Sequence, residues 1–464
     1  MTTFANTGES GLGAPTLDDM RSSREQRAWY WYDWANSGYV TTTGTVLFGP
    51  YLTSIAKTAA GCGDGPCTET LNILGLPVAP GSLFFYAVTF STLLSAVLLP
   101  IVGAVADRRG DKRKLLGRFA WLGAAAAAAM FFVSGSNWQL GVALLIIGNL
   151  SLGGSLVIYD AILCDIAVPD DRDRVSSRGW AFGYVGGGLL LIVNLLIVLM
   201  PEALGIDTSM AVRISLLSAG IWWGAWSVIP YRRIIDRPPT GLPPSADVQF
   251  VRGAFSQLND TLRDLKHYPN TALFLGAYLF YNDGVQTVIS SASVYGAEQL
   301  GFSETILIAT IVLVQIVGFV GALLFGRIAA RVGAKRAIGN SLVVWIGAVA
   351  AGYFLPEGKV LFFLLLAAVF GIVLGGIQAL SRSLFSQLVP RSREAEYFAL
   401  YQACERGTSW LGTLVFGLVH QLTGSYRPAI VSLLAFFIIG GLLFRKVDIR
   451  AGIAGAGNTV PAVV

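Results

Sequence analysis

The sequence predicts an all-α integral membrane protein whose twelve transmembrane helices form two similar halves. Three observations support this fold class: the composition, the number of long apolar segments and the distribution of basic residues along the chain. Of the 464 residues, 54% are hydrophobic and only 13% are charged, whereas soluble domains carry about 25% charged residues. Lipid, rather than water, is therefore the predicted surrounding of most of the chain.

Twelve segments are long and apolar enough to be transmembrane helices, which need about 20 mostly apolar residues each. The fourth, fifth, seventh and eleventh carry polar residues and are the weaker predictions. The twelve predicted spans are 29–54, 80–105, 115–134, 138–163, 176–200, 210–231, 270–296, 304–326, 336–355, 359–381, 395–421 and 427–445.

The longest polar stretch between spans, 232–269, divides the chain into six spans plus six. Residues 1–20 lack the basic start and apolar core of a secretory signal, so the first span is expected to stay as an anchor. The expected organisation is a disordered cytoplasmic tail (1–26), a first half (27–231), a cytoplasmic middle loop (232–269), a second half (270–446) and a cytoplasmic tail (447–464).

The basic residues test the number of spans, because Lys and Arg gather in cytoplasmic loops. With a cytoplasmic N-terminus, 28 of the 33 Lys and Arg fall on the cytoplasmic side and only four on the outer side. Arg406 lies within a span. Such a bias supports both the count and the orientation, with both termini in the cytoplasm. It also explains the net charge of +5 without a nucleic-acid partner.

The two halves contain similar loop sequences, which indicates an internal repeat. "GAVADRRGDKR" (103–113) follows the second span and "GRIAARVGAKR" (326–336) follows the eighth. "YDWANS" (32–37) in the first span corresponds in position to "YNDGVQT" (281–287) in the seventh. Two six-helix halves repeated in the same orientation are a known transporter layout.

The loop sequence resembles the "GxxxDRxGrRR" motif of the major facilitator superfamily. The second copy departs from the motif, since Ala330 replaces its acidic residue. Within that superfamily, "YDWANS", "YNDGVQT" and "GGIQALSRSLFSQLVP…AEYFALY" resemble the UMF1 group, which is related to the fungal vacuolar effluxer called autophagy-related protein 22. The resemblance covers roughly residues 27–445 and implies the major facilitator fold.

In this motif the resemblance implies a gating role, because the loop holds neighbouring helices together in one conformation. Breaking a charge-assisted hydrogen bond there would shift the equilibrium between conformations. The expected gating residues of the two copies are Gly103, Asp107, Arg108, Gly110, Arg113, Arg331, Gly333 and Arg336.

Asp33 is an ionisable residue inside the first predicted span, where a charge is costly unless it faces a cavity or a partner. Asp283 occupies the matching span of the second half. The resemblance implies that these two helices line the central cavity, so both carboxylates are candidates for binding substrate or a proton. The alternative is an interfacial Asp33 held by Arg27 or by backbone. Side chains that could extend the same faces are Asn36, Tyr281, Asn282 and Gln286, although Tyr281 could equally belong to an interfacial aromatic belt.

Asp160 and Asp165 lie near the cytoplasmic end of the fourth span. Asp160 is the deeper of the two and is a candidate binding residue, whereas Asp165 is expected to gate or to pair with the basic loops. Gln378 and Arg382 are four residues apart in the tenth span and so share a face. Arg382 could bind a substrate carboxylate or phosphate bidentately, or it could form a cytoplasmic gate with Asp160 or Asp165.

Glu405 and Arg406 are adjacent in the eleventh span and point about 100° apart, so they do not pair with each other. Glu405 is a candidate proton-binding residue, with a local ion pair as the alternative. Cys62 and Cys67 fall in the first outer loop, where a disulfide is predicted because that compartment permits one. The two histidines are far apart and no metal-ligand or nucleotide-binding spacing occurs, so no metal and no cofactor are expected.

We therefore expect a monomeric, multi-pass transporter of the plasma (inner) membrane that moves a small polar organic solute. Amino-acid efflux is the first hypothesis, because of the distant fungal resemblance, and coupling to protons is suggested by Asp33, Asp283 and Glu405. A lipid or amphiphile translocase is the second hypothesis and a non-transporting receptor the third. An enzyme is not expected, since no nucleophile–base pair or metal constellation is present.

Overall fold

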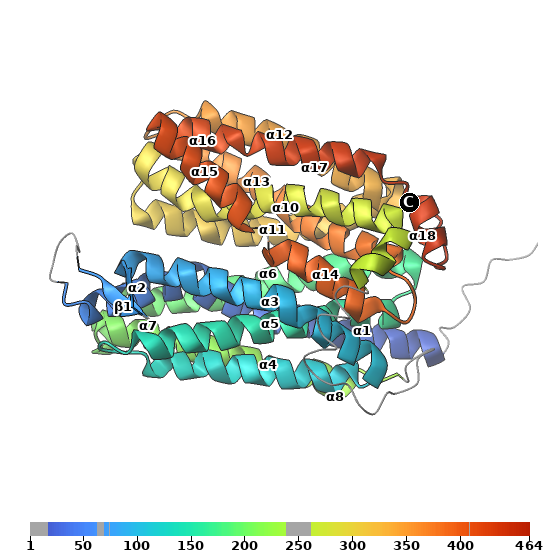
Figure 1. The fold of residues 1–464 in the computed structure, drawn as a ribbon, viewed down its shortest axis with the longest axis horizontal. Coiled ribbons are helices and arrows are strands. Elements are labelled where there is room, and N and C mark those ends of the chain that lie inside the picture. Colours follow the sequence, from blue (N-terminus) through green and yellow to red (C-terminus); the bar gives the residue numbers. More distant parts are fainter. Residues whose placement is uncertain (1–16, 63–68, 74, 238–260, 408) are drawn as a thin grey trace, which may run out of the picture.

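The computed structural model describes residues 17–62, 69–73, 75–237, 261–407 and 409–464. Two helical bundles lie side by side, one built from the first part of the chain and one from the second (Figure 1). α6 packs against α11 and α13 of the second bundle, and α14 packs against α3 and α5 of the first. α5 also packs against α13, and these helix pairs join the halves.

The first half begins with a long helix that passes through a π-helical stretch. Its elements are α1 (Leu17–Tyr39), π-helical Val40–Leu47, α2 (Phe48–Ala59), β1 (Leu71–Ile73), β2 (Leu76–Val78), α3 (Leu83–Arg109), α4 (Lys112–Ala129), α5 (Trp138–Ile166), α6 (Arg172–Leu199), α7 (Thr208–Trp226) and α8 (Val228–Arg233). β1 and β2 form a small antiparallel hairpin outside the bundle. Short 3-10 turns lie at Pro80–Ser82, Met130–Phe132, Pro169–Asp171 and Glu202–Leu204.

The second half repeats this succession of long helices. Its elements are a 3-10 turn (Leu265–His267), α10 (Pro269–Val294), π-helical Tyr295–Gln299, α11 (Glu304–Val332), α12 (Ala334–Tyr353), α13 (Val360–Leu388), α14 (Glu394–Gly407), α15 (Ser409–Thr423), α16 (Tyr426–Ser432), α17 (Leu434–Lys446) and α18 (Ile449–Gly455).

Eight helical segments of the described chain are long and apolar enough to cross a membrane. They run over 80–109, 112–132, 138–166, 169–199, 208–233, 305–332, 360–388 and 426–446. The other four predicted spans also fall on helices: α1 to α2, α10, α12, and α14 with α15. Twelve therefore remains the prediction. Three of these four segments carry Asp33, Asp283 or Glu405, so the weakest apolar signal coincides with the candidate functional residues.

One end of the molecule collects most of the basic turns. The start of α1, the turn between α3 and α4, α8 and α18 all lie at this end, on the right of Figure 1. We call it the basic end. The β1–β2 hairpin and α2 lie at the opposite end.

The predicted tails are more ordered than expected in the described residues. α1 begins at Leu17, so the disordered tail predicted for 1–26 is wrong from residue 17 onward. Glu25 is buried and binds Arg237 at 2.8 Å, and this pair gives the helix start a partner. The C-terminal segment also folds back, since the Asn458 amide donates to the carbonyls of Gln387 and Val389. Most of the predicted middle loop lies outside the described residues.

Candidate functional site: a buried arginine between the halves

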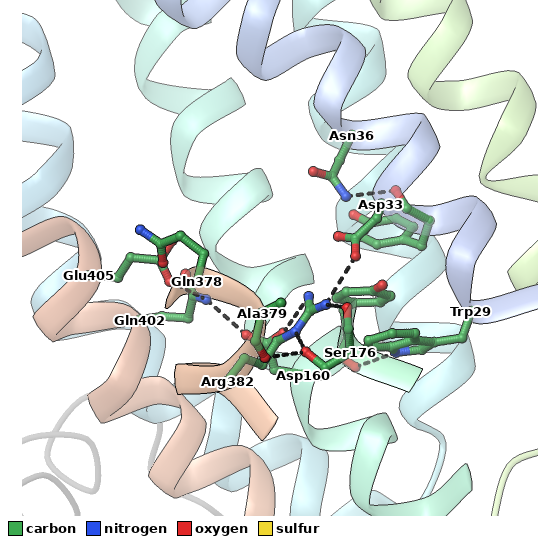
Figure 2. A network of polar contacts seen from close by, with 12 residues as sticks. Trp29, Asp33, Asn36, Asp160, Ser176, Gln378, Ala379, Arg382, Gln402 and Glu405 are labelled. Carbon is green, nitrogen blue, oxygen red and sulfur yellow. Dashed lines mark hydrogen bonds and ion pairs between the residues drawn. The ribbon is translucent and has the colours of Figure 1, made fainter. Parts of the chain in front are cut away.

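Arg382 of α13 is buried, with its guanidinium between two carboxylates of the first half. Nη2 donates to Asp33 Oδ2 on α1 at 3.2 Å, and Nη1 donates to Asp160 Oδ1 on α5 at 3.5 Å. Nε donates to the Ser176 hydroxyl on α6 at 2.9 Å, and Nη2 also donates to the Ser176 carbonyl at 3.0 Å. Figure 2 shows these groups converging on the guanidinium. One cation of the second half thus joins three helices of the first.

Aromatic rings surround the same guanidinium. Its carbon lies 4.8 Å from the ring centroid of Trp29, 5.4 Å from that of Tyr159 and 5.5 Å from that of Trp180. Trp29 stacks on Tyr159 at 4.1 Å and donates its indole N–H to the Tyr159 carbonyl at 2.8 Å. Aromatic faces attract cations, most strongly where water is excluded. The first half therefore supplies both the charge and the π-faces that hold Arg382.

Gln402 of α14 links Asp160 of the first half to Glu405 and Arg406 of the second half. Its amide donates to Asp160 Oδ2 at 2.9 Å and to Glu405 Oε2 at 3.2 Å, while its oxygen accepts from Arg406 Nε at 3.2 Å. Glu405 and Arg406 thus meet through Gln402, consistent with their different directions on the helix. The connected ionisable groups are three carboxylates, Asp33, Asp160 and Glu405, and two guanidiniums, Arg382 and Arg406.

The network lies toward the basic end rather than at mid-membrane. Asp160 is six residues before the end of α5 at Ile166, and Arg382 is six before the end of α13 at Leu388. At 1.5 Å per residue, both are about 9 Å from their helix ends. A buried charge at this depth is tolerated only with partners. The geometry suits a gate near one membrane face.

More hydrogen bonds cross between the halves beside this network. The Ser176 hydroxyl donates to the Ala379 carbonyl at 2.7 Å, and Arg172 Nη1 donates to the Ser386 carbonyl at 2.7 Å. Ser383 donates to the Asp173 carboxylate. These cross-half hydrogen bonds all lie toward the basic end. This structure is therefore closed at the basic end.

A separate polar chain lies wholly in the second half. Gln378 donates to Asn282 Oδ1 at 2.9 Å, and Asn282 donates to the Glu405 carbonyl at 3.1 Å. These bonds tie α13, α10 and α14 together. Gln378 is four residues before Arg382 on α13, as predicted. Its partner Asn282 belongs to the second half, whereas the partners of Arg382 belong to the first.

Asp283 does not join Asp33. It is 1% exposed near the middle of the helical segment Pro269–Gln299, and its Oδ2 accepts the backbone N–H of Gly412 at 2.9 Å. Its Oδ1 has no hydrogen-bond partner in the described structure, and neither does the buried Thr287 hydroxyl one turn later. The first and second halves therefore place their matching carboxylates in different surroundings.

Three other predicted residues have local roles or little contact. Asn36 donates to the Tyr32 carbonyl of its own helix at 2.6 Å. The Tyr281 hydroxyl shares a 2.7 Å hydrogen bond with Ser381, so Tyr281 is a buried helix-packing residue rather than part of an interfacial belt. Gln286 is partly buried. Asp33 is held by Arg382 rather than by Arg27.

Asp107 caps the start of α14 across the interface between the halves. Its Oδ1 accepts the N–H of Ala395 at 3.0 Å and its Oδ2 accepts that of Glu396 at 2.9 Å. Free amides at a helix N-terminus bind a carboxylate favourably. Gly103, one turn earlier, lets α3 approach closely, because a Cβ there would collide with the Ala395 backbone. Arg393 just before α14 binds Glu396 at 2.8 Å, which raises the pKa of its guanidinium.

The rest of the first loop copy acts inside the first half. Gly110 ends α3 with a left-handed φ of 66°. Lys112 binds Asp165 at 3.1 Å, so Asp165 anchors the basic loop as predicted. Arg113 binds Asp236 at 3.2 Å and lies over the ring of Tyr231. Arg108 is partly buried.

In the second loop copy, Gly326 packs against Ser177 of α6, but the two arginines form no hydrogen bond or ion pair with the first half in the described structure. Arg331 and Arg336 are exposed. Gly333 has a φ of 88° between α11 and α12. Lys335 instead donates to the Val447 carbonyl at 2.6 Å, within its own half. The structure therefore does not bring Arg331, Gly333 and Arg336 together with the Arg382 network.

The cysteines fall into two groups. Cys62 is disulfide-bonded, whereas Cys164 and Cys404 form no disulfide. Cys67 lies outside the described residues, so its pairing with Cys62 stays a prediction. Over the described ranges, no cluster of His, Cys, Asp or Glu could hold a metal ion.

Sequence reasoning missed several parts of the site. Ser176, Gln402, Trp29, Tyr159 and Trp180 were not candidates, although all contact Arg382 or its carboxylates. Gln402 directly follows the distinctive segment 395–401 and could have been suspected for that reason. Ser176 and the aromatic rings carry no comparable signal, since such residues are common in membrane helices.

Comparisons with known proteins identify the family. The family described as vacuole effluxer Atg22 like matches residues 21–457. The chain belongs to this family. It is 30% identical to the MFS-type transporter YxiO of Bacillus subtilis (strain 168), over 90% of this chain and 94% of that protein. It is 24% identical to autophagy-related protein 22 of Pyricularia oryzae, over 93% of this chain and 77% of that protein.

Solved structures show the same fold. The human organic anion transporter MFSD10 (TETRAN) matches with a TM-score of 0.64 and 15% identity, over 91% of this chain and 99% of that one. The proton:xylose symporter XylE matches with a TM-score of 0.63 and 13% identity, over 92% and 95%. The predicted major facilitator fold is confirmed. The chain is a multi-pass membrane transporter of this type, and not an enzyme.

Proposed function

We propose that this protein is a secondary active transporter that exports a small polar organic solute, with amino acids as the first candidates, by alternating access. The observation that carries the proposal is the placement of Arg382. Its ionic and aromatic partners all belong to the first half, whereas it belongs to the second. Opening the basic end must separate these groups. Arg382 therefore stabilises the state that is closed at the basic end.

The charges of the network suggest how the Arg382 ion pairs are broken when the basic end opens. The connected network contains three carboxylates and two guanidiniums. If all were ionised, the buried cluster would carry one excess negative charge, which is unfavourable in a low-dielectric interior. One bound proton neutralises it. Protonation of Asp33 or Asp160 also weakens the hold on Arg382 and so favours opening.

Asp283 is a second candidate proton carrier. It lies near the membrane midplane with one unpartnered carboxylate oxygen. Transporters of this general layout bind substrate and coupling ions near the midplane. The Arg382 network would then serve as the gate, and the region of Asp283 as part of the binding region.

The direction and location of transport follow from the family and the basic residues. The family is described as effluxers, and the basic end is expected to face the cytoplasm. Since the 30% identical relative is bacterial, we propose the plasma membrane, with cytoplasmic termini, a monomeric unit and no nucleic-acid partner. Proton coupling would supply the driving force.

Purified protein in proteoliposomes tests this function. Efflux of labelled amino acids, with a pH dye inside, should show solute movement together with proton movement. Asp33→Asn and Asp160→Asn should abolish the proton signal. Asp207→Asn is the matched control, because Asp207 only caps α7 by accepting from Met210 and Asn is an equally good cap.

Two outcomes would contradict the proposal. Solute transport with an unchanged proton signal in both carboxylate variants would remove the coupling hypothesis. Movement of labelled phospholipid without movement of any polar solute would replace amino-acid efflux with the lipid or amphiphile translocase hypothesis.

A further inference from the structure

A groove on the lipid-facing side of the second half combines an apolar floor with a basic rim. It lies between α12 and α17 and has a volume of about 540 Å³. We call it the α12–α17 groove. Its floor includes Gly339, Val343, Ile346, Ile438, Gly441 and Leu442. Its rim at the basic end is formed by Lys335, Arg336 and Arg445.

The sequence builds this groove by helical periodicity. Arg336, Gly339, Val343 and Ile346 follow one another at spacings of three or four on α12, so they form a single stripe. On α17, Ile438 is four residues before Leu442 and Gly441 is four before Arg445, so these residues also share one face. The glycines make the depression, because a Cβ at Gly339 would meet no atom within 4 Å. Both stripes end in an arginine at the basic end.

The groove has the length of one lipid leaflet. From Arg336 to Ile346 is ten residues, or about 15 Å along the helix. That is half of the roughly 30 Å hydrocarbon core. An acyl chain could therefore lie along the floor while its headgroup reaches the arginines.

The charges of the rim are available for a ligand. Lys335 Nζ donates to the carbonyls of Val447 at 2.6 Å and Arg445 at 3.4 Å, so it already has protein partners. Arg336 and Arg445 are exposed, and neither side chain has a hydrogen-bond or ion-pair partner in the described structure. The nearest acidic side chain in sequence, Asp448, caps α18 by accepting from Ala451. The rim thus has two guanidiniums that the protein does not neutralise.

Two internal comparisons show that this arrangement is specific. In the first half, Arg113 matches Arg336, but Asp236 neutralises it and the Tyr231 ring packs beside it. At the other end of α12, a second groove of about 400 Å³ between α12 and α13 contains no ionisable lining residue. Of these three places, only the α12–α17 groove has both an apolar floor and arginine side chains without a protein partner.

We infer that the α12–α17 groove is a binding site for one anionic phospholipid of the leaflet at the basic end. The phosphodiester would accept from Arg336 and Arg445, as guanidinium groups suit phosphate oxygens. One acyl chain would cover the stripe between the two glycines. This inference does not depend on which solute is transported.

Binding is tested by native mass spectrometry of purified protein with added dioleoylphosphatidylglycerol or dioleoylphosphatidylcholine. Wild type should retain one phosphatidylglycerol more tightly than phosphatidylcholine. Arg336→Gln/Arg445→Gln should weaken phosphatidylglycerol binding roughly tenfold or more, since each surface cation contributes about 1 kcal/mol toward anionic lipid. Binding of phosphatidylcholine, which has the same phosphodiester but no net charge, should weaken less.

Two further variants separate a built site from general surface charge. Arg331→Gln removes an exposed cation at the same end but outside the groove, and should leave tight phosphatidylglycerol binding intact. Gly339→Phe fills the open floor and should displace lipid while Arg336 and Arg445 remain. The inference is overturned if Arg331→Gln weakens binding as much as the double variant, or if neither the double variant nor Gly339→Phe reduces it.

Discussion

The two copies of the repeated loop have similar sequences but different structural roles. In the first copy, 103–113, Asp107 crosses to the second half and caps α14. In the second copy, 326–336, Ala330 stands at that place, and the exposed Arg331 and Arg336 form no hydrogen bond or ion pair with the first half in the described residues. Gly326 still packs against Ser177 of the first half. One acidic side chain therefore distinguishes a loop that is hydrogen-bonded to the other half from a loop that packs against it without such a bond.

The asymmetry extends to the buried charges. The second half contributes a cation, Arg382, and the first half contributes its carboxylates, Asp33 and Asp160. Closure of the basic end uses two different devices: a carboxylate of the first half on a helix N-terminus of the second, and an arginine of the second half in a carboxylate pair of the first. A repeated sequence thus does not require a symmetric mechanism.

The largest effect is expected from removing Arg382. Arg382→Gln leaves Asp33 and Asp160 buried without their cation, which typically costs 3–5 kcal/mol when one partner of a buried pair is lost. We expect a lower thermal midpoint and no measurable transport. Arg382→Lys should recover part of the stability but little transport, because Lys cannot bind both carboxylates and Ser176 at once.

Arg331→Gln is the control for Arg382→Gln, since it removes an exposed arginine that forms no hydrogen bond or ion pair in the described structure. Thermal unfolding and transport of this variant should match wild type. Equal losses in Arg331→Gln and Arg382→Gln would show that the buried network has no special role.

A smaller effect is expected at Asp107. Asp107→Ala removes a helix cap, which typically costs about 1 kcal/mol and up to about 2. Because this cap joins the two halves, its loss destabilises the closed state relative to the open one. The open population should rise about fivefold or more. Free Cys164, whose thiol contacts the Ser386 carbonyl across the interface, would report this as faster maleimide labelling in a Cys404→Ser background.

Asp107→Asn removes the charge and one of the two acceptor oxygens at this cap. Since the amide oxygen can still accept from one of the two N–H groups, its labelling rate should lie between those of wild type and Asp107→Ala. If Asp107→Ala also labels at the wild-type rate, α14 is held by its packing on α3 and α5 alone.

The fold could be predicted from the sequence because hydropathy and the basic residues report directly on the membrane. The start of α1 could not, since Glu25 gains its partner Arg237 only in the folded chain. The carboxylate at Asp33 was conspicuous for its cost in a span, whereas its partner Arg382 lies 349 residues away. One of the two acidic partners considered for Arg382, Asp160, does contact it, and the other, Asp165, binds Lys112 instead.

The repeat was misleading at Asp283. Matching positions in the two halves suggested one shared environment, yet Asp33 meets a guanidinium and Asp283 meets a backbone N–H. The sequence of a repeat predicts where a residue lies in its own half. It does not predict what the other half places opposite it.

Asp283→Asn sharpens this difference between the halves. The amide oxygen can still accept from Gly412, so we expect a smaller loss of stability than in Arg382→Gln. Transport should lose its dependence on pH if Asp283 carries a proton. Thr287→Val, which removes the neighbouring unpartnered hydroxyl, is the control and should keep that dependence. An unchanged pH profile in Asp283→Asn would assign proton coupling to the Arg382 network alone.

The smallest effect compares the matched arginines of the two loop copies. Arg113→Gln breaks a partly exposed pair with Asp236, and such pairs contribute about 0.2–1 kcal/mol. Arg336→Gln breaks no protein contact in the described structure and should not change stability in lipid-free detergent. Adding phosphatidylglycerol should reverse the order, because lipid would then stabilise wild type and Arg113→Gln more than Arg336→Gln. Thermal unfolding of wild type and both variants, with and without phosphatidylglycerol, measures these changes in stability. If Arg336→Gln responds to the lipid as Arg113→Gln does, the exposed arginine of the second copy has no ligand.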